Sequence, residues 1–121
     1  MKIAILLPYK ENFTKNNAGA VSIFVNDTNK LSDYTNQIKV YGSTEKKNKL
    51  TNYINIGLKK NILSSTSSQY LKNFAKIISK ENIDILEVHN RPHYIDYLHS
   101  ISNSKKILFF HNDPLKMQGS I

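Results

Sequence analysis

The chain has 121 residues, of which 40% are hydrophobic and 21% are charged, and its formal net charge is +8. This length suits one folded domain, and apolar clusters separated by short polar stretches argue against a disordered chain. The absence of cysteine excludes disulfides, thiolate zinc sites and cysteine nucleophiles, and no apolar run approaches the roughly 20 residues that cross a bilayer.

The first third of the chain predicts a strand, a loop and a helix. Residues 3–7 form a continuous aliphatic run, which is typical of a strand buried on both faces of a parallel sheet. After a polar loop, apolar residues recur at three- and four-residue spacing from Val21 to Leu31, which predicts an amphipathic helix. This order of elements is the first half of a βαβ unit.

The middle of the chain predicts two strands and a second helix. Residues 37–41 read as a strand, residues 44–51 as a polar surface loop, and residues 53–56 as a weaker strand that is compatible with an edge position. Residues 64–68 offer several possible N-caps for a helix that ends before Asn82.

The last third predicts a fourth strand at residues 84–88, a helix that starts at Pro92 and continues to Ile101, and a fifth strand at residues 105–110. Strands that alternate with helices in this way predict an α/β fold. We therefore expect residues 1–121 to form one Rossmann-like domain with a doubly wound parallel sheet of about five strands.

Three polar loops, at residues 8–19, 89–93 and 111–114, are predicted to share one edge of this sheet, because ligands bind beyond the carboxyl ends of parallel strands. Gly19 lies between Ala18 and Ala20, without the G-x-G-x-x-G pattern of dinucleotide-binding proteins. Two interpretations stay open for it. The glycine either permits a tight turn or lets backbone amides at a helix N-terminus approach a phosphate.

The other polar residues of this edge also have two interpretations each. His89 and His93 have a metal-ligand spacing, but a strand-to-helix break separates them, so we expect no metal site. Arg91 either decorates a helix start or clamps a phosphate or carboxylate. His111 is either a satisfied rim histidine or a functional one, and Asp113 is either turn chemistry before a proline or part of the site.

Four segments of the chain carry a resemblance to a known family. They are KIAILLP at residues 2–8, GAVS at 19–22, EVHNRP at 87–92 and HNDPL at 111–115, the last continuing into MQGS at 117–120. Together they resemble the N-terminal half of a GT-B glycosyltransferase of family 4, in the domain known as glycosyltransferase subfamily 4-like, N-terminal. The last two segments are the most specific.

The resemblance implies retaining transfer of a sugar from a nucleotide-sugar donor to a glycan or lipid-linked acceptor, commonly an intermediate of lipopolysaccharide, capsule or other cell-envelope glycans. It implies no metal and no permanently bound cofactor. In the family, two adjacent glycines often stand where this chain has one. The residues that match the family's functional positions are His111 as catalytic residue near the transferred sugar, Ala18, Gly19 and Ala20 at the donor diphosphate, and His89, Asn90, Arg91 and Asp113 on the acceptor side.

The family's nucleotide-binding C-terminal domain has no counterpart in these 121 residues, nor has the helix that follows the fifth strand. We therefore expect an N-terminal domain that is incomplete at its C-terminus and has little or no transferase activity alone. Three alternatives stay open for it: a truncated open reading frame, a fragment, or one half of a split enzyme whose partner is a separate C-terminal GT-B domain. The alternative is a non-catalytic nucleotide- or sugar-binding module.

The positive charge raises a third class, nucleic-acid binding. The lysines are scattered from Lys2 to Lys116 and no recognised nucleic-acid motif is present, so we expect no nucleic-acid partner. A solvated lysine-rich surface explains the charge, and attraction to anionic lipid is a further alternative. Because residues 1–7 are too short for a signal peptide, we expect a cytoplasmic protein, with attachment to the inner face of the cell membrane as the variant of that expectation.

Overall fold

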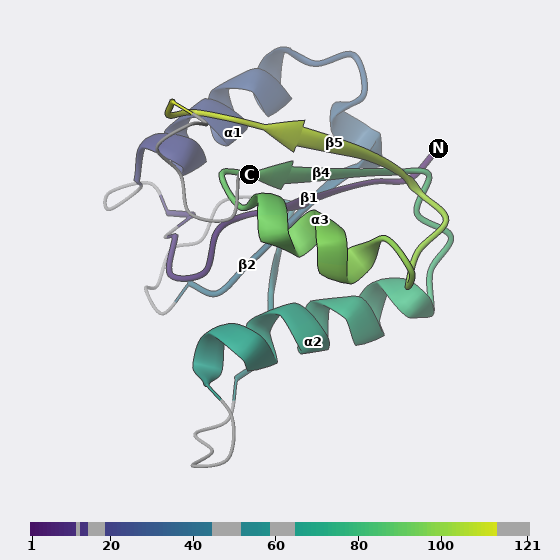
Figure 1. The fold of residues 1–121 in the computed structure, drawn as a ribbon. Coiled ribbons are helices and arrows are strands. Elements are labelled where there is room, and N and C mark those ends of the chain that lie inside the picture. Colours follow the sequence, from purple (N-terminus) through teal and green to yellow (C-terminus); the bar gives the residue numbers. More distant parts are fainter. Residues whose placement is uncertain (12, 15–18, 45–51, 59–64, 114–121) are drawn as a thin grey trace.

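The computed structural model describes residues 1–11, 13–14, 19–44, 52–58 and 65–113, and within them five parallel strands form one sheet (Figure 1). The order across the sheet is β3-β2-β1-β4-β5, with neighbours hydrogen-bonded in parallel. The strands are β1 (Ile3–Leu6), β2 (Ile38–Gly42), β3 (Tyr53–Asn55), β4 (Ile85–His89) and β5 (Lys105–Phe109). The predicted Rossmann-like, doubly wound parallel sheet is therefore confirmed.

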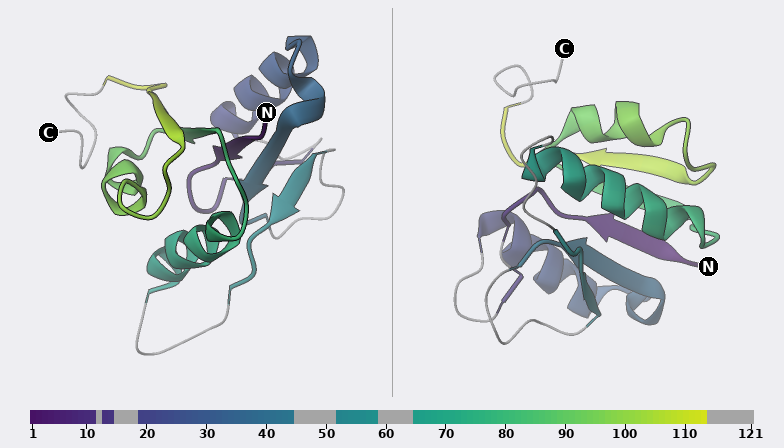
Figure 2. Two further views of the ribbon diagram at one scale, coloured as in Figure 1. Left: turned by 90° about the vertical axis from the view of Figure 1, so that its right-hand side faces the viewer. Right: turned by 90° about the horizontal axis from the view of Figure 1, so that it is seen from below.

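Helices cover both faces of the sheet (Figure 2). They are α1 (Ala20–Leu31), α2 (Thr66–Ser79) and α3 (Pro92–Leu98), with a 3₁₀ turn at Thr35–Gln37 that the sequence did not predict. Helix α1 lies on one face, and α2 and α3 lie on the other. Among the described helices, none combines the length and the apolar character that crossing a bilayer requires.

Strand β1 explains why the chain begins with an unbroken aliphatic run. Ala4 and Leu6 pack into the core beneath α2 and α3, whereas Ile5 and Leu7 pack into the core beneath α1. All four side chains are buried. Since successive side chains of a strand point to opposite faces, a strand covered on both faces has no position for a polar side chain.

Element boundaries differ from the predicted ones by a few residues. Helix α2 begins where the serine-rich segment predicted, because Ser65 caps it by accepting a hydrogen bond from the Ser68 amide at 3.1 Å. Helix α3 ends at Leu98 rather than Ile101, whose side chain is 37% exposed and is not held against the core. Of the predicted surface loop over residues 44–51, residues 45–51 lie outside the described residues.

Three tyrosines fix the chain where it leaves β1. The Tyr70 hydroxyl of α2 donates to the Leu7 carbonyl at 2.6 Å, and the Tyr9 amide donates to the Tyr94 hydroxyl of α3 at 3.3 Å. The Tyr9 hydroxyl in turn donates to Thr66 Oγ1 at 2.8 Å. These contacts tie the loop after β1 to both helices of one face, at the carboxyl edge of the sheet.

We predict that Tyr70→Phe lowers the free energy of unfolding by about 1–3 kcal/mol, because it leaves the Leu7 carbonyl buried without this donor. Urea denaturation of the whole chain measures the effect. Tyr97→Phe is the matched control, since the Tyr97 side chain is 38% exposed and the same atom is removed there. Equal stability losses in the two variants would contradict the role given to the Tyr70 hydroxyl.

Candidate functional site

The carboxyl ends of β1, β4 and β5 meet at one edge of the sheet, together with the N-termini of α1 and α3. The chain leaves β1 toward α1 on one face, whereas α3 follows β4 on the other face. A crevice forms at such a switch point because the two connections diverge. The predicted residues Gly19 and Ala20 lie at the start of α1, His89 to Arg91 at the end of β4, and His111 and Asp113 beyond β5.

A histidine pair lies at the centre of this edge. His89 Nδ1 is 2.7 Å from His111 Nε2, and the two rings stack at 24° with centroids 5.0 Å apart. His89 is only 1% exposed. Both histidines were singled out from the sequence, but their contact was not. The strand register contains the signal, because His89 pairs with Phe109 and His111 follows two residues later on the same face.

Aromatic rings surround the histidine pair. Phe109 stacks on His89 at 17° with centroids 5.3 Å apart, and the Phe24 ring of α1 meets His111 edge-on at 80° and 4.9 Å. Burial is the main cause that lowers the pKa of His111, and the neighbouring His89 lowers it further. The carboxylates of Glu11 and Glu87 act in the opposite direction. The lowered pKa favours the neutral ring of His111, which has one donor and one acceptor nitrogen.

Asn90 and Arg91 shape the loop that holds this pair. Asn90 has a φ of 56°, in the left-handed region that asparagine tolerates better than most residues. Its side-chain oxygen accepts a hydrogen bond from the His111 backbone amide at 2.7 Å, and the Asn90 backbone amide donates to the Phe109 carbonyl at 2.9 Å. Arg91 Nη1 donates to the Asn90 carbonyl at 2.7 Å. Asn90 thus joins the ends of β4 and β5 and positions His111.

The N-terminus of α1 already holds an anionic group. Gly19 is the N-cap and supplies no side chain, while Glu11 Oε1 accepts a hydrogen bond from the Ser22 amide at 2.9 Å. A Cβ atom at Gly19 would collide with this carboxylate, so a larger residue there would make the Glu11 side chain shift. A phosphate could accept from the Ser22 amide only after Glu11 moves away. Ala18, the third predicted phosphate contact, lies outside the described residues.

The remaining predicted residues are not joined to the pair in the same way. His93 is exposed on α3, where its ring meets Tyr94 rather than His89. Asp113 is exposed beyond His111. Within the described part of the chain, no group of three or more histidine or acidic side chains is arranged to hold a metal ion. Glu11 was missed from the sequence, where it is one acid in a polar loop.

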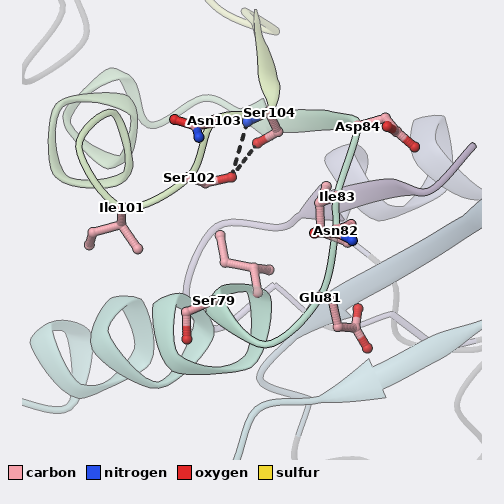
Figure 3. Close-up of a pocket in the computed structure, with 10 residues that line it drawn as sticks. Ser79, Glu81, Asn82, Ile83, Asp84, Ile101, Ser102, Asn103 and Ser104 are labelled. Carbon is pink, nitrogen blue, oxygen red and sulfur yellow. Dashed lines mark hydrogen bonds between the residues drawn. The ribbon is translucent and has the colours of Figure 1, made fainter.

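Two hollows lie at the opposite, amino-terminal edge of the sheet. The larger, of about 590 Å³, is bounded by the end of α2 and by the turn that precedes β5 (Figure 3). Its polar lining includes Ser102 and Ser104, whose hydroxyls are 2.6 Å apart, so these groups satisfy one another. The smaller measures about 230 Å³. We place the candidate site at the carboxyl edge, because the buried histidine and the helix N-terminus lie there.

We predict that Glu11→Ala lowers the free energy of unfolding by about 1 kcal/mol, because the first turn of α1 loses the group that accepts from its amide. Asp33→Ala is the control, since Asp33 is exposed beyond the other end of α1, and it should change stability by less than about 0.5 kcal/mol. Chemical denaturation of both variants measures this. A loss for Asp33→Ala as large as that for Glu11→Ala would contradict the capping role.

The stability of the folded chain should depend on pH through His111. Because folding lowers the pKa of His111, the unfolded chain binds more protons than the folded chain as pH falls below about 6.5. The stabilising contribution of neutral His111 is complete above that pH and is lost as pH falls through the lowered pKa. His111→Leu should therefore lose less stability on acidification than the wild type.

Denaturation curves collected at several pH values test this expectation. His99→Gln is the control, because His99 is exposed and lies outside the pair, and its pH profile should follow the wild type. His93, whose pKa burial also lowers, is present in every protein compared and cancels in the difference. A His111→Leu profile parallel to the wild type would show that His111 does not contribute.

No protein-family model, curated protein or solved structure matches the chain. We therefore infer a function from the geometry of the carboxyl edge. This edge has a histidine held by a buried histidine and an asparagine, beside a helix N-terminus that a carboxylate occupies.

Proposed function

We propose that this domain is the acceptor-side wall of a glycosyltransferase cleft, with the sugar that is transferred lying against His111. The observation that carries the proposal is the position of His111, held by His89 and Asn90 at the switch point of a Rossmann-like sheet. Sugar hydroxyls both donate and accept hydrogen bonds, and the ring nitrogen of His111 that does not face His89, Nδ1, can form one with such a hydroxyl. The four family-like sequence segments support the same reading.

Groups around His111 can contact the other parts of the ligand. The Phe24 ring beside His111 offers an apolar surface next to the polar group, a combination that small-molecule sites commonly use. Arg91 lies at the start of α3, where its guanidinium suits a phosphate or carboxylate of the acceptor. The donor diphosphate is assigned to the N-terminus of α1, once the Glu11 carboxylate has moved out.

A second candidate is a sugar-binding module that takes no nucleotide. The Glu11 carboxylate favours it, because this group already satisfies the amide that a diphosphate would contact. The two candidates share His111 and differ at α1. In the first, a ligand phosphate replaces Glu11, whereas in the second Glu11 stays in place.

Binding measurements on the whole chain test the proposal. We expect UDP-glucose or GDP-mannose to change the amide NMR signals of both Gly19 and His111, whereas the second candidate predicts changes near His111 alone, with the free sugar as effective as the nucleotide-sugar. His111→Ala should weaken binding by about tenfold, since one hydrogen bond of roughly 1.4 kcal/mol is lost. His99→Ala is the control and should bind like the wild type. Signals at both positions that none of these ligands changes would contradict both candidates.

A further inference from the structure

Three titratable side chains lie in a row on the α1 side of the sheet. Glu87 and His89 are two residues apart on β4 and therefore share a face, and His111 follows β5 on the same face. Glu87 Oε2 is 3.5 Å from His89 Nε2, and His89 Nδ1 is 2.7 Å from His111 Nε2. The row runs from a partly exposed carboxylate through a fully buried imidazole to the histidine of the candidate site.

The short contact between the two imidazoles restricts where their protons lie. Two ring nitrogens 2.7 Å apart need one N–H and one lone pair between them. For two neutral rings, either His89 donates from Nδ1 or His111 donates from Nε2. Both arrangements satisfy this contact, so the other nitrogen of His89 decides between them.

That other nitrogen, His89 Nε2, is buried and makes no hydrogen bond among the described residues. Its charged neighbour is Glu87, whose Oε2 atom lies 3.5 Å away. If Nε2 carries the proton, its N–H group lies near this oxygen without a formed hydrogen bond, whereas without the proton a lone pair lies near it. The Glu87 oxygen attracts the N–H group of the protonated nitrogen and repels the lone pair of the unprotonated one. Burial increases the energy difference between the two tautomers, because water does not screen the interaction.

We propose that Glu87 and His89 are positioning residues that fix the tautomer of His111. Glu87 holds the proton of His89 on Nε2, His89 Nδ1 accepts from His111 Nε2, and His111 Nδ1 keeps its lone pair. No described residue makes a hydrogen bond to His111 Nδ1, and His111 is partly exposed, so this lone pair is available to a ligand. The candidate site thus presents an acceptor to a hydroxyl group of its ligand.

We call Glu87, His89 and His111 the relay, because the carboxylate acts on His111 through His89. The other neighbours of His111 do not provide an alternative to it. Phe24 and Phe109 are uncharged, and Asn90 is engaged with the backbone amide of His111 rather than with its ring. Glu11, on the loop after β1, acts on the pKa of His111 but accepts its hydrogen bond from the Ser22 amide. Glu87 is therefore the carboxylate that lies on the far side of His89.

The identity of the hydroxyl as part of a sugar rests on the proposed function, but the tautomer does not. NMR spectra of ¹⁵N-labelled chain, which correlate ring nitrogens with ring protons, report the tautomer directly when recorded above the pH range of histidine titration. We expect both His89 and His111 to carry their proton on Nε2. A proton on His89 Nδ1 would overturn the proposal.

Glu87→Gln tests the cause of the tautomer, and it should fold because the Glu87 side chain is partly exposed and glutamine has the same shape. We expect the ring-nitrogen shifts of His111 to move toward a mixture of tautomers, and its pKa to fall because a carboxylate that raises it is gone. Asp33→Asn removes one exposed carboxylate elsewhere and should change neither. Wild-type ring-nitrogen shifts in Glu87→Gln would refute the role of Glu87.

The same variants separate this inference from the proposed function. If wild-type His89 and His111 show the expected tautomers but UDP-glucose, GDP-mannose and the free sugars all fail to bind, the relay stands and the sugar assignment fails. If a sugar ligand binds and Glu87→Gln leaves both its affinity and the tautomers unchanged, the sugar assignment stands and the relay fails. We expect Glu87→Gln to weaken binding several-fold.

Discussion

The burial of β1 on both faces is the constraint on which the rest of this structure depends. The strand pairs with β2 on one side and with β4 on the other, and its side chains enter two separate cores. Each buried leucine or isoleucine contributes on the order of 1.5–3 kcal/mol by leaving water. To cover both faces, the chain must place α1 on one side and α2 with α3 on the other, and the loops at the carboxyl edge consequently diverge.

This edge is where the fold can hold polar side chains. The strand ladder ends there, and backbone groups that the ladder no longer satisfies take side-chain partners instead. Tyr70 donates to the carbonyl of Leu7, and Asn90 accepts from the amide of His111. A buried polar group without a partner costs about 1–3 kcal/mol. His89 Nδ1 has its partner in His111, whereas His89 Nε2 makes no hydrogen bond among the described residues and has the Glu87 carboxylate 3.5 Å away. Positioning and function therefore involve the same contacts.

The N-terminus of α1 has a related arrangement with a different consequence. Helix N-termini attract anions through exposed amides and the helix dipole, and here the protein supplies its own anion in Glu11. A ligand phosphate would compete with that carboxylate rather than enter an empty place, so any affinity for a nucleotide is reduced by the free energy of displacing it. At His111, Nε2 faces His89, and no described residue makes a hydrogen bond to Nδ1.

The sequence by itself determined the strands, the helices and their order. Burial on both faces leaves an aliphatic run at residues 3–7, and burial on one face leaves the helical spacing of Val21, Phe24 and Val25, whereas Leu31, predicted in the same stripe, is 87% exposed. It also determined that polar loops follow β1, β4 and β5 and share an edge, since this requires only that the strands be parallel. These hydrophobic patterns are local, because the burial of a strand or helix face selects apolar residues at positions close together in the sequence.

Only the tertiary structure decided which side chains of that edge meet. The contact between His89 and His111 depends on the register of β4 against β5, and the reach of Glu11 to the Ser22 amide depends on the path of a loop. Neither follows from local periodicity, because residues far apart along the chain are brought together by packing that involves the whole sheet. For the same reason the metal-like spacing of His89 and His93 was uninformative, whereas the pair that forms is separated by a helix and a strand.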